Sequence, residues 1–149
     1  MVTKLEHCTS SCCPMACALD IIGDHWTLLV IRDLMFLGRH EYKDMLAGEE
    51  GISSNILSGR LKKLEGAGII TFVQHPESKR RKLYYLTQKG KDLVYIMLDV
   101  ARWADKHLDD KVVIPEDRRF FLDMPAETVA NTVFDKLAAW EKEFIGGSL

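Results

Sequence analysis

The apolar residues in the first part of the chain fall into helix-length groups separated by turns. A first helix is predicted to begin at Cys13-Pro14, because proline suits the first helical position, and to end near Gly23. A second group, over 26–36, is almost entirely apolar, so we expect this helix to lie in the core. A short helix over 42–46 follows. These groups predict three helices before the turn at 48–51.

A fourth helix is predicted to follow Ser53, whose hydroxyl is suited to cap its first turn. Leu57, Leu61 and Leu64 recur at intervals of four and three residues, which places them in one inward stripe. The opposite face carries Ser54, Asn55, Ser58, Lys62 and Lys63. One side of this helix therefore belongs to the core, and the other is open to solvent or to a partner.

A β-hairpin is predicted next, because strand-like residues at 69–74 and 83–86 flank a polar, basic connection at 75–82. A long fifth helix is expected from a cap at Thr87 to about His107. Apolar residues wrap most of its circumference, which so small a domain cannot cover alone, so we expect a partner subunit on it. The alternative is that the C-terminal residues cover this helix.

The C-terminal residues contain one further predicted helix, opened by Pro125 and closed by Gly146-Gly147. Its residues Val129, Val133, Leu137 and Phe144 lie near one face. The expected organisation is a loose cysteine-bearing tail over 1–12, a folded domain over 13–107 and a helical extension over 108–149. The fold class is mainly α, with a two-stranded β-hairpin and additional C-terminal helices that serve dimerisation.

Composition and charge indicate what kind of molecule this chain binds. The chain has 149 residues, and 47% of them are apolar, which suits one compact domain. No apolar run approaches the ~20 residues of a membrane span, and the start of the chain does not resemble a signal peptide. We therefore expect a cytoplasmic protein that does not bind a membrane. The net charge is −2, yet residues 53–91 carry nine basic and two acidic side chains. This basic segment indicates a local anionic partner, and the alternative is a solvated charged face.

The order of elements, three helices and a capped helix followed by a basic hairpin and a long helix, is that of a winged helix-turn-helix. Such proteins read DNA bases with the N-terminal part of the capped helix, here Ser53, Ser54, Asn55 and Ser58. The expected phosphate contacts are Arg60, Lys62 and Lys63 on the helix and Lys79, Arg80, Arg81 and Lys82 on the wing. The sequence therefore predicts a regulator that binds double-stranded DNA at a pseudo-palindromic operator. A protein-interaction module that uses the same fold is the alternative.

Residues 13–107 resemble the HxlR-type regulators, relatives of the MarR-like winged-helix proteins. The matching pieces are Cys13-Pro14, 18–23, Trp26, 51–53, Leu57, Leu61, Leu64-Glu65, Gly68, His75-Pro76, Arg81, Tyr84, Leu86-Thr87 and Gly90. The resemblance implies a recognition helix at 53–65 and a DNA-contacting wing at 74–84. It also implies a homodimer built from the first and last helices of this region, and we expect Leu19, Leu93, Met97, Val100 and Trp103 in its interface.

Two departures from the family pattern affect the predicted DNA contacts. Residues 78–80 replace prolines that are common at the wing tip, and Glu41 stands where a basic residue is usual. The family pattern does not account for residues 108–149.

The four cysteines, Cys8, Cys12, Cys13 and Cys17, all fall within the first 17 residues, which does not suit a disulfide framework. Cys13 is expected at a helix start, where the helix dipole favours the thiolate, and Cys17 and Cys12 are near enough to resolve its oxidation. The resemblance implies an oxidant- or electrophile-responsive cysteine at this position. A structural or incidental role is one alternative. A zinc–thiolate sensor is another, although the spacing is not the usual C-x2-C pairing; no metal or cofactor is predicted.

An enzyme is not predicted. Cys13 with His7 or His25 offers a nucleophile and a base, but nothing supplies an orienting third group or an oxyanion hole. The sequence also contains no phosphate-binding glycine loop and no paired-carboxylate motif.

Overall fold

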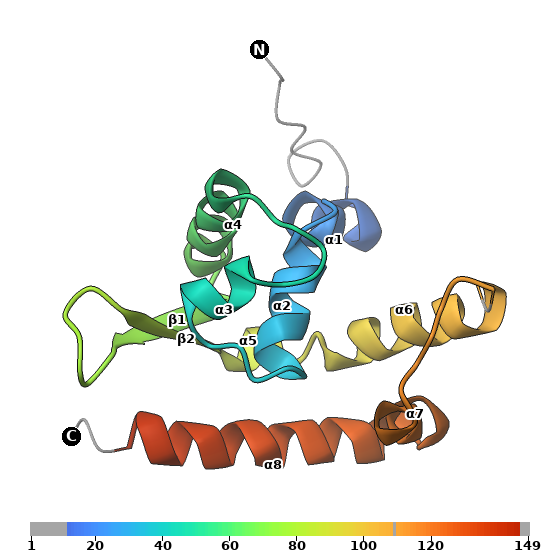
Figure 1. Ribbon diagram of the computed structural model, residues 1–149. Coiled ribbons are helices and arrows are strands. Elements are labelled where there is room, and N and C mark those ends of the chain that lie inside the picture. Colours follow the sequence, from blue (N-terminus) through green and yellow to red (C-terminus); the bar gives the residue numbers. More distant parts are fainter. Residues whose placement is uncertain (1–11, 109, 147–149) are drawn as a thin grey trace. The chain divides into compact units, whose positions relative to one another are not determined.

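The computed structural model describes residues 12–108 and 110–146 (Figure 1). The chain divides into two compact units, Met1–Thr87 and Gln88–Leu149. The first unit holds helices α1 to α4 and the hairpin β1–β2, and the second holds helices α5 to α8. Among the described helices none is long and apolar enough by itself to cross a membrane, and only α1 and α2 taken together, with a 77° bend between them, meet that requirement.

The four helices of the first unit confirm the predicted ones to within about one residue at each end. They are α1 Pro14–Ile22, α2 Thr27–Met35, α3 Tyr42–Leu46 and α4 Ser54–Gly66. Pro14 opens α1, with Cys13 as its N-cap. Ser53 caps α4, because its hydroxyl oxygen accepts a hydrogen bond of 3.3 Å from the backbone N–H of Ile56. This bond satisfies one of the donors that a helix start leaves without a partner.

The core of the first unit forms where α2 packs against α4 and β2. The leucine stripe of α4 is buried as predicted, and Leu57 and Leu64 have no exposed surface. The other buried apolar residues of this unit are Val30, Ile31, Leu34, Met35, Met45, Ile69, Ile70, Leu83, Tyr84 and Leu86. Burial of this apolar surface fixes which face of α4 points outward.

The hairpin consists of β1 Ile70–Gln74 and β2 Lys82–Leu86, paired antiparallel with Phe72 opposite Tyr84. Its connecting loop extends away from the helices of this unit (Figure 1). The buried residue His40, which lies just before α3, is bonded to β2 through both its backbone carbonyl and its side-chain ring. Its carbonyl accepts from the N–H of Tyr84 at 2.8 Å, and its ring Nδ1–H donates to the carbonyl of Tyr84 at 2.8 Å. These bonds hold the hairpin to the segment that leads into the helix-turn-helix.

The predicted single helix from Thr87 to His107 is wrong, because the structure has two helices there. These are α5 Gln88–Lys91 and α6 Val94–His107. The N–H of Leu93 bonds to the carbonyl of Gly90, three residues back, and this tighter turn interrupts the helical ladder. The hydroxyl of Thr87 donates to the carbonyls of Gly68 and Ile69 and so anchors the end of β2 to the segment before β1.

The remaining helices are α7 Glu116–Asp123, which the sequence analysis missed, and α8 Ala126–Phe144. Pro125 precedes α8 as predicted, and Val129, Val133 and Leu137 are buried. Phe144, at the last position of this helix, is 40% exposed. Within this unit α6 packs on α7 and α8, which cover part of its surface.

Asp24 joins the start of α2 to α4. Its carboxylate accepts hydrogen bonds from the backbone N–H groups of Trp26 (2.9 Å) and Thr27 (3.0 Å) and from the Thr27 hydroxyl. Nε of Arg60 donates to the same carboxylate at 2.7 Å, and Nζ of Lys63 lies 3.7 Å from it. Burial acts to raise the pKa of Asp24, but the hydrogen bonds from Thr27, Arg60 and Trp26 outweigh it and hold the pKa at about 2.

We predict that Asp24→Asn lowers the free energy of unfolding at pH 7 by on the order of 1 kcal/mol, since solvent screens this partly exposed cluster. Because the folded-state pKa lies below the usual 3.8, the stabilisation is complete well above pH 3.8 and is lost as the pH falls towards about 2. The difference between the two proteins should therefore shrink towards half near pH 3. Denaturant titrations from pH 7 to pH 3 measure it, with the exposed Asp135→Asn as control. A difference that does not change with pH would contradict this assignment.

Candidate nucleic-acid interface

The first turns of α4 present the residues that the sequence predicted as base readers. Ser54, Asn55 and Ser58 are exposed, and Ser53 is exposed but uses its oxygen as the helix cap. Tyr42 of α3 lies against this surface: its hydroxyl donates to the carbonyl of Ser54 at 3.1 Å and accepts from the Ser58 hydroxyl at 3.4 Å. The side chain of Asn55 makes no hydrogen bond within the described residues, so it is available to a ligand.

The three predicted phosphate contacts of α4 differ in whether they already pair with a carboxylate. Lys62 is exposed, and no ion pair holds it among the residues that the structure describes. Arg60 and Lys63 instead pair with Asp24, and about 30% of each side chain is exposed. The structure thus separates one available cation from two that already have an anionic partner.

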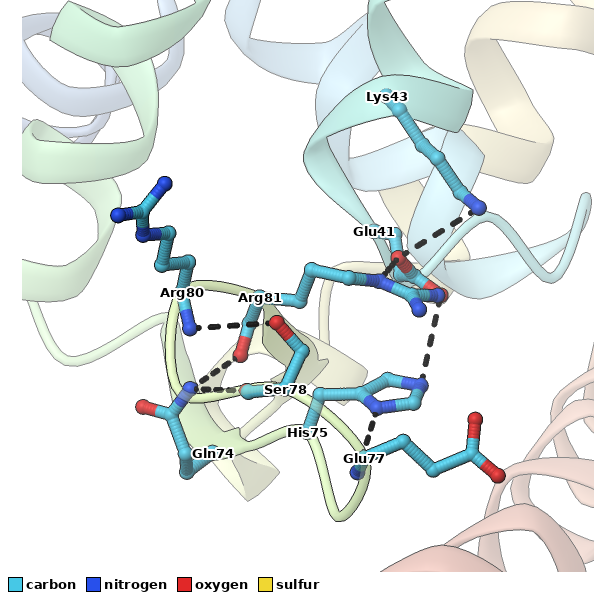
Figure 2. Close-up of polar contacts among 8 residues, drawn as sticks. All are labelled: Glu41, Lys43, Gln74, His75, Glu77, Ser78, Arg80 and Arg81. Carbon is cyan, nitrogen blue, oxygen red and sulfur yellow. Dashed lines mark hydrogen bonds and ion pairs between the residues drawn. The ribbon is translucent and has the colours of Figure 1, made fainter.

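The predicted wing cations divide in the same way. Lys79, Arg80 and Lys82 are exposed, and Nζ of Lys82 lies 4.0 Å from the ring centroid of Phe72. Arg81 is paired with Glu41 through two bonds, Nε to Oε2 at 2.8 Å and a terminal nitrogen to Oε1 at 2.5 Å. Figure 2 shows the side chain of Arg81 directed at Glu41, whereas that of Arg80 points away from it.

The side-chain nitrogens of three residues surround the carboxylate of Glu41. Besides Arg81, Nζ of Lys43 and Nε2 of His75 each lie 3.9 Å from its oxygens (Figure 2). The hydrogen bond from Arg81 lowers the pKa of Glu41, so this carboxylate remains ionised. Glu41 departs from the family pattern, and in the structure its carboxylate holds the guanidinium of Arg81.

Two open grooves border these residues. One, of about 380 Å³, is lined by Glu41, Tyr42, Lys43, Arg80, Arg81, Lys82 and Tyr84. The other, of about 750 Å³, lies between α4 and the hairpin, and its lining includes Ser58, Lys62, Phe72, Lys82 and Tyr84. Tyr42, Lys82 and Tyr84 border both grooves. The outer face of α4 and the wing therefore form one hollowed, largely cationic surface with aromatic side chains in it.

The predicted redox cysteines lie at the start of α1. Cys12 and Cys13 are exposed and Cys17 is half-buried, and the N–H of Cys17 donates to the carbonyl of Cys13 at 3.1 Å. Cys8 falls outside the described residues. Within the described part of the chain no group of three or more histidine, cysteine, aspartate or glutamate side chains is placed to hold a metal ion.

The residues predicted for a dimer interface are found on α1 and around α6. Leu19 of α1 is 55% exposed, and Val100 and Trp103 of α6 are 53% and 60% exposed. Leu93 and Met97 are half-buried. Met15 of α1 and Tyr95 and Ile96 of α6 are exposed as well, so each of these helices carries an apolar surface towards solvent.

Comparison with known proteins identifies the family. The model of the HxlR-like helix-turn-helix family matches residues 21–112, more than half of the chain. The HTH-type transcriptional regulator YvaP of Bacillus subtilis is 34% identical over 92 residues, which are 62% of this chain and 84% of YvaP. YodB of Bacillus subtilis is 31% identical over 108 residues, which are 72% of this chain and 96% of YodB. The matched region of a Mycobacterium tuberculosis regulator is only 56% of that protein's length.

Solved structures agree with this assignment. A MarR-family transcriptional regulator from Porphyromonas gingivalis superimposes with a TM-score of 0.58 at 28% identity, over 65% of this chain and 94% of that one. The oxidized form of the redox regulator HypR gives a TM-score of 0.56 at 26% identity, over 64% and 97% of the two chains. The reduced form of YodB gives 0.53 at 28% identity, over 68% and 100%.

The fold and the relatives lead to one assignment. The winged helix-turn-helix predicted from the sequence is present, with the hairpin β1–β2 as the wing. The named relatives are transcriptional regulators and none of them is an enzyme. The chain belongs to the HxlR-like helix-turn-helix family and is a transcriptional regulator of the HxlR/MarR type.

Proposed function

We propose that this chain is a homodimeric regulator that binds a pseudo-palindromic duplex sequence, with the start of α4 in the major groove. One observation carries the proposal: the exposed, unbonded amide of Asn55 lies on the same surface as cations that have no ion pair within the described residues. An asparagine amide pairs with the adenine edge through two hydrogen bonds. Ser54 and Ser58 are short enough to let the helix approach the bases.

In this proposal the phosphate contacts are the exposed cations Lys62, Lys79, Arg80 and Lys82. Lys62 lies on the outer face of α4, and the other three lie on the wing. The groove between α4 and the wing then receives the DNA backbone. Arg60 and Lys63 are poorer candidates than the sequence alone indicated, because binding a phosphate would require them to leave Asp24.

Asn55→Ala and Lys62→Ala separate base reading from phosphate binding. Asn55→Ala should weaken binding to the preferred site by roughly 1–3 kcal/mol and relax the preference at one position of each half-site.

Lys62→Ala should weaken binding to all duplexes alike, and the dependence of log K on log salt should become shallower by about 0.9. Selection of bound sites from random duplexes, followed by salt titrations, measures both. The exposed Lys136→Ala of α8 is the control. Full retention of sequence preference by the Asn55 variant would show that α4 is misplaced.

The proposed dimer uses the exposed apolar residues of α1 and α6. Val100 and Trp103 lie one turn apart on α6, and both side chains are more than half exposed. A second copy of the chain can bury this apolar surface, which stabilises a dimer. A twofold dimer presents two reading helices to half-sites about one helical turn, roughly 34–36 Å, or a multiple of it apart.

Trp103→Glu should convert the dimer into a monomer, because it places a charge in an apolar interface. Affinity for the palindromic site should then fall towards that for a single half-site. Sedimentation velocity at micromolar protein measures the mass, and Val113→Glu, at a position that is 92% exposed, is the control. A wild-type protein that is monomeric under these conditions would contradict the dimer.

The proposed signal is an oxidant or an electrophile acting on Cys13. This thiol is exposed at the N-cap of α1, the helix that also carries Leu19. HypR, which is similar to this chain in structure, is described as a redox regulator. A hydroperoxide would transfer one oxygen to the Cys13 thiolate, releasing water or an alcohol and leaving a sulfenic acid. Condensation of this sulfenic acid with the thiol of Cys17 or Cys12 forms a disulfide and releases one molecule of water. An electrophile would instead alkylate Cys13.

Cys13→Ser should abolish the change in duplex affinity that hydrogen peroxide causes, while leaving the affinity of the reduced protein unchanged. Gel shifts with thiol reductant and with peroxide measure this effect. Cys12→Ser, at the neighbouring exposed position, tests whether any exposed thiol suffices. A peroxide response that survives in the Cys13 variant assigns the sensing to another residue.

A further inference from the structure

The pairing of Arg81 with Glu41 lies at the edge of a cationic groove. Lys43, Arg80, Arg81 and Lys82 line this groove, and Glu41 is the only carboxylate in its lining. The Glu41 side chain is 15% exposed and that of Arg81 is 40% exposed. A carboxylate at this place lowers the positive charge of a surface that otherwise attracts anions.

The wing does not need this ion pair to hold its shape. The amide of Gln74 donates to the carbonyls of Ser78 and Arg81 at 2.7 and 2.6 Å, and the N–H of His75 donates to the carbonyl of Arg81 at 2.9 Å. The N–H of Arg80 also donates to the Ser78 hydroxyl at 3.3 Å (Figure 2). The backbone at Arg81 is thus fixed by the hairpin itself, and its side chain can change partner without a change in the loop.

The position of the wing beside α3 does not need the ion pair either. The two hydrogen bonds between His40 and Tyr84 already join β2 to the segment before α3. Glu41 occupies the N-cap position of α3, but its side chain makes no capping hydrogen bond. Removal of the carboxylate therefore leaves the backbone contacts of both elements in place.

The guanidinium of Arg81 has the geometry that binds carboxylate and phosphate oxygens alike. Its two parallel bonds to Glu41 are those that arginine forms with a phosphate group. Glu41 is in this sense an internal substitute for a backbone phosphate.

We propose that the groove lined by Lys43, Arg80, Arg81 and Lys82 is a subsite for one phosphate of duplex DNA, and that Glu41 competes with this phosphate for Arg81. This inference rests on the proposed DNA binding. In the native protein Arg81 stays on Glu41 and adds little to duplex affinity, so the wing binds through its other cations. Glu41 thereby limits the strength of non-specific binding, which depends on phosphate contacts.

The test measures duplex affinity and its salt dependence for Glu41→Gln, with Glu77→Gln as the matched control. Glu77 is an exposed carboxylate of the same wing and has no ion pair within the described residues, so its replacement changes the charge equally but releases no guanidinium. Glu41→Gln should bind duplex roughly two- to fivefold more tightly than the native chain, which is the range expected for a partly exposed ion pair. The salt slope should become steeper by about 0.9, and the control should show no comparable change in slope.

Arg81→Ala, made in both backgrounds, supplies the second measurement. In the native background it should change affinity less than about twofold, and in the Glu41→Gln background it should abolish the whole gain. A loss of tenfold or more on Arg81→Ala in the native background overturns the inference, because Arg81 would then bind DNA despite Glu41. Equal effects of Glu41→Gln and Glu77→Gln overturn it too. If the native protein binds no duplex at any salt concentration, it is the proposed function that fails.

Discussion

The hydrogen bonds between His40 and Tyr84 determine how the wing is placed relative to the helix-turn-helix. They join residues 44 positions apart in the sequence, and both residues are buried. Breaking these bonds would leave buried polar groups without partners, which destabilises the folded state. The leucine stripe of α4 packs into the same unit and turns the polar face of that helix outward. Because both elements are fixed to one core, the amide of Asn55 and the wing cations are presented on a preformed surface.

Within that surface two carboxylates decide which cations remain available. Asp24 holds Arg60 and Lys63, and Glu41 holds Arg81. The net positive charge of residues 53–91 therefore overstates the number of side chains that are ready to bind phosphate. Charge counting along the sequence marks this segment as basic, but contacts between distant residues determine which of its cations already have an anionic partner.

Local signals were sufficient to predict most elements of the first unit. Ser53 caps α4, Pro14 opens α1, and the basic loop joins two strands, all of which depend on residues a few positions apart. The break near Leu93 was missed because residues 88–92 are polar or glycine, so no apolar pattern shows where one helix ends and the next begins. Helix α7 was missed because its first turn is entirely charged. The pairs Asp24–Arg60 and Glu41–Arg81 join residues 36 and 40 positions apart, which no local pattern indicates.

We propose that the exposed cations of α4 and the wing bind the DNA backbone. The most direct test is the rate of chemical acetylation of each lysine, measured by mass spectrometry with and without a bound duplex. We predict that the duplex protects Lys62, Lys79 and Lys82 from acetylation, and that the exposed Lys136 and Lys142 of α8 react at unchanged rates. Unchanged acetylation of Lys62, Lys79 and Lys82 in a saturated complex would contradict it.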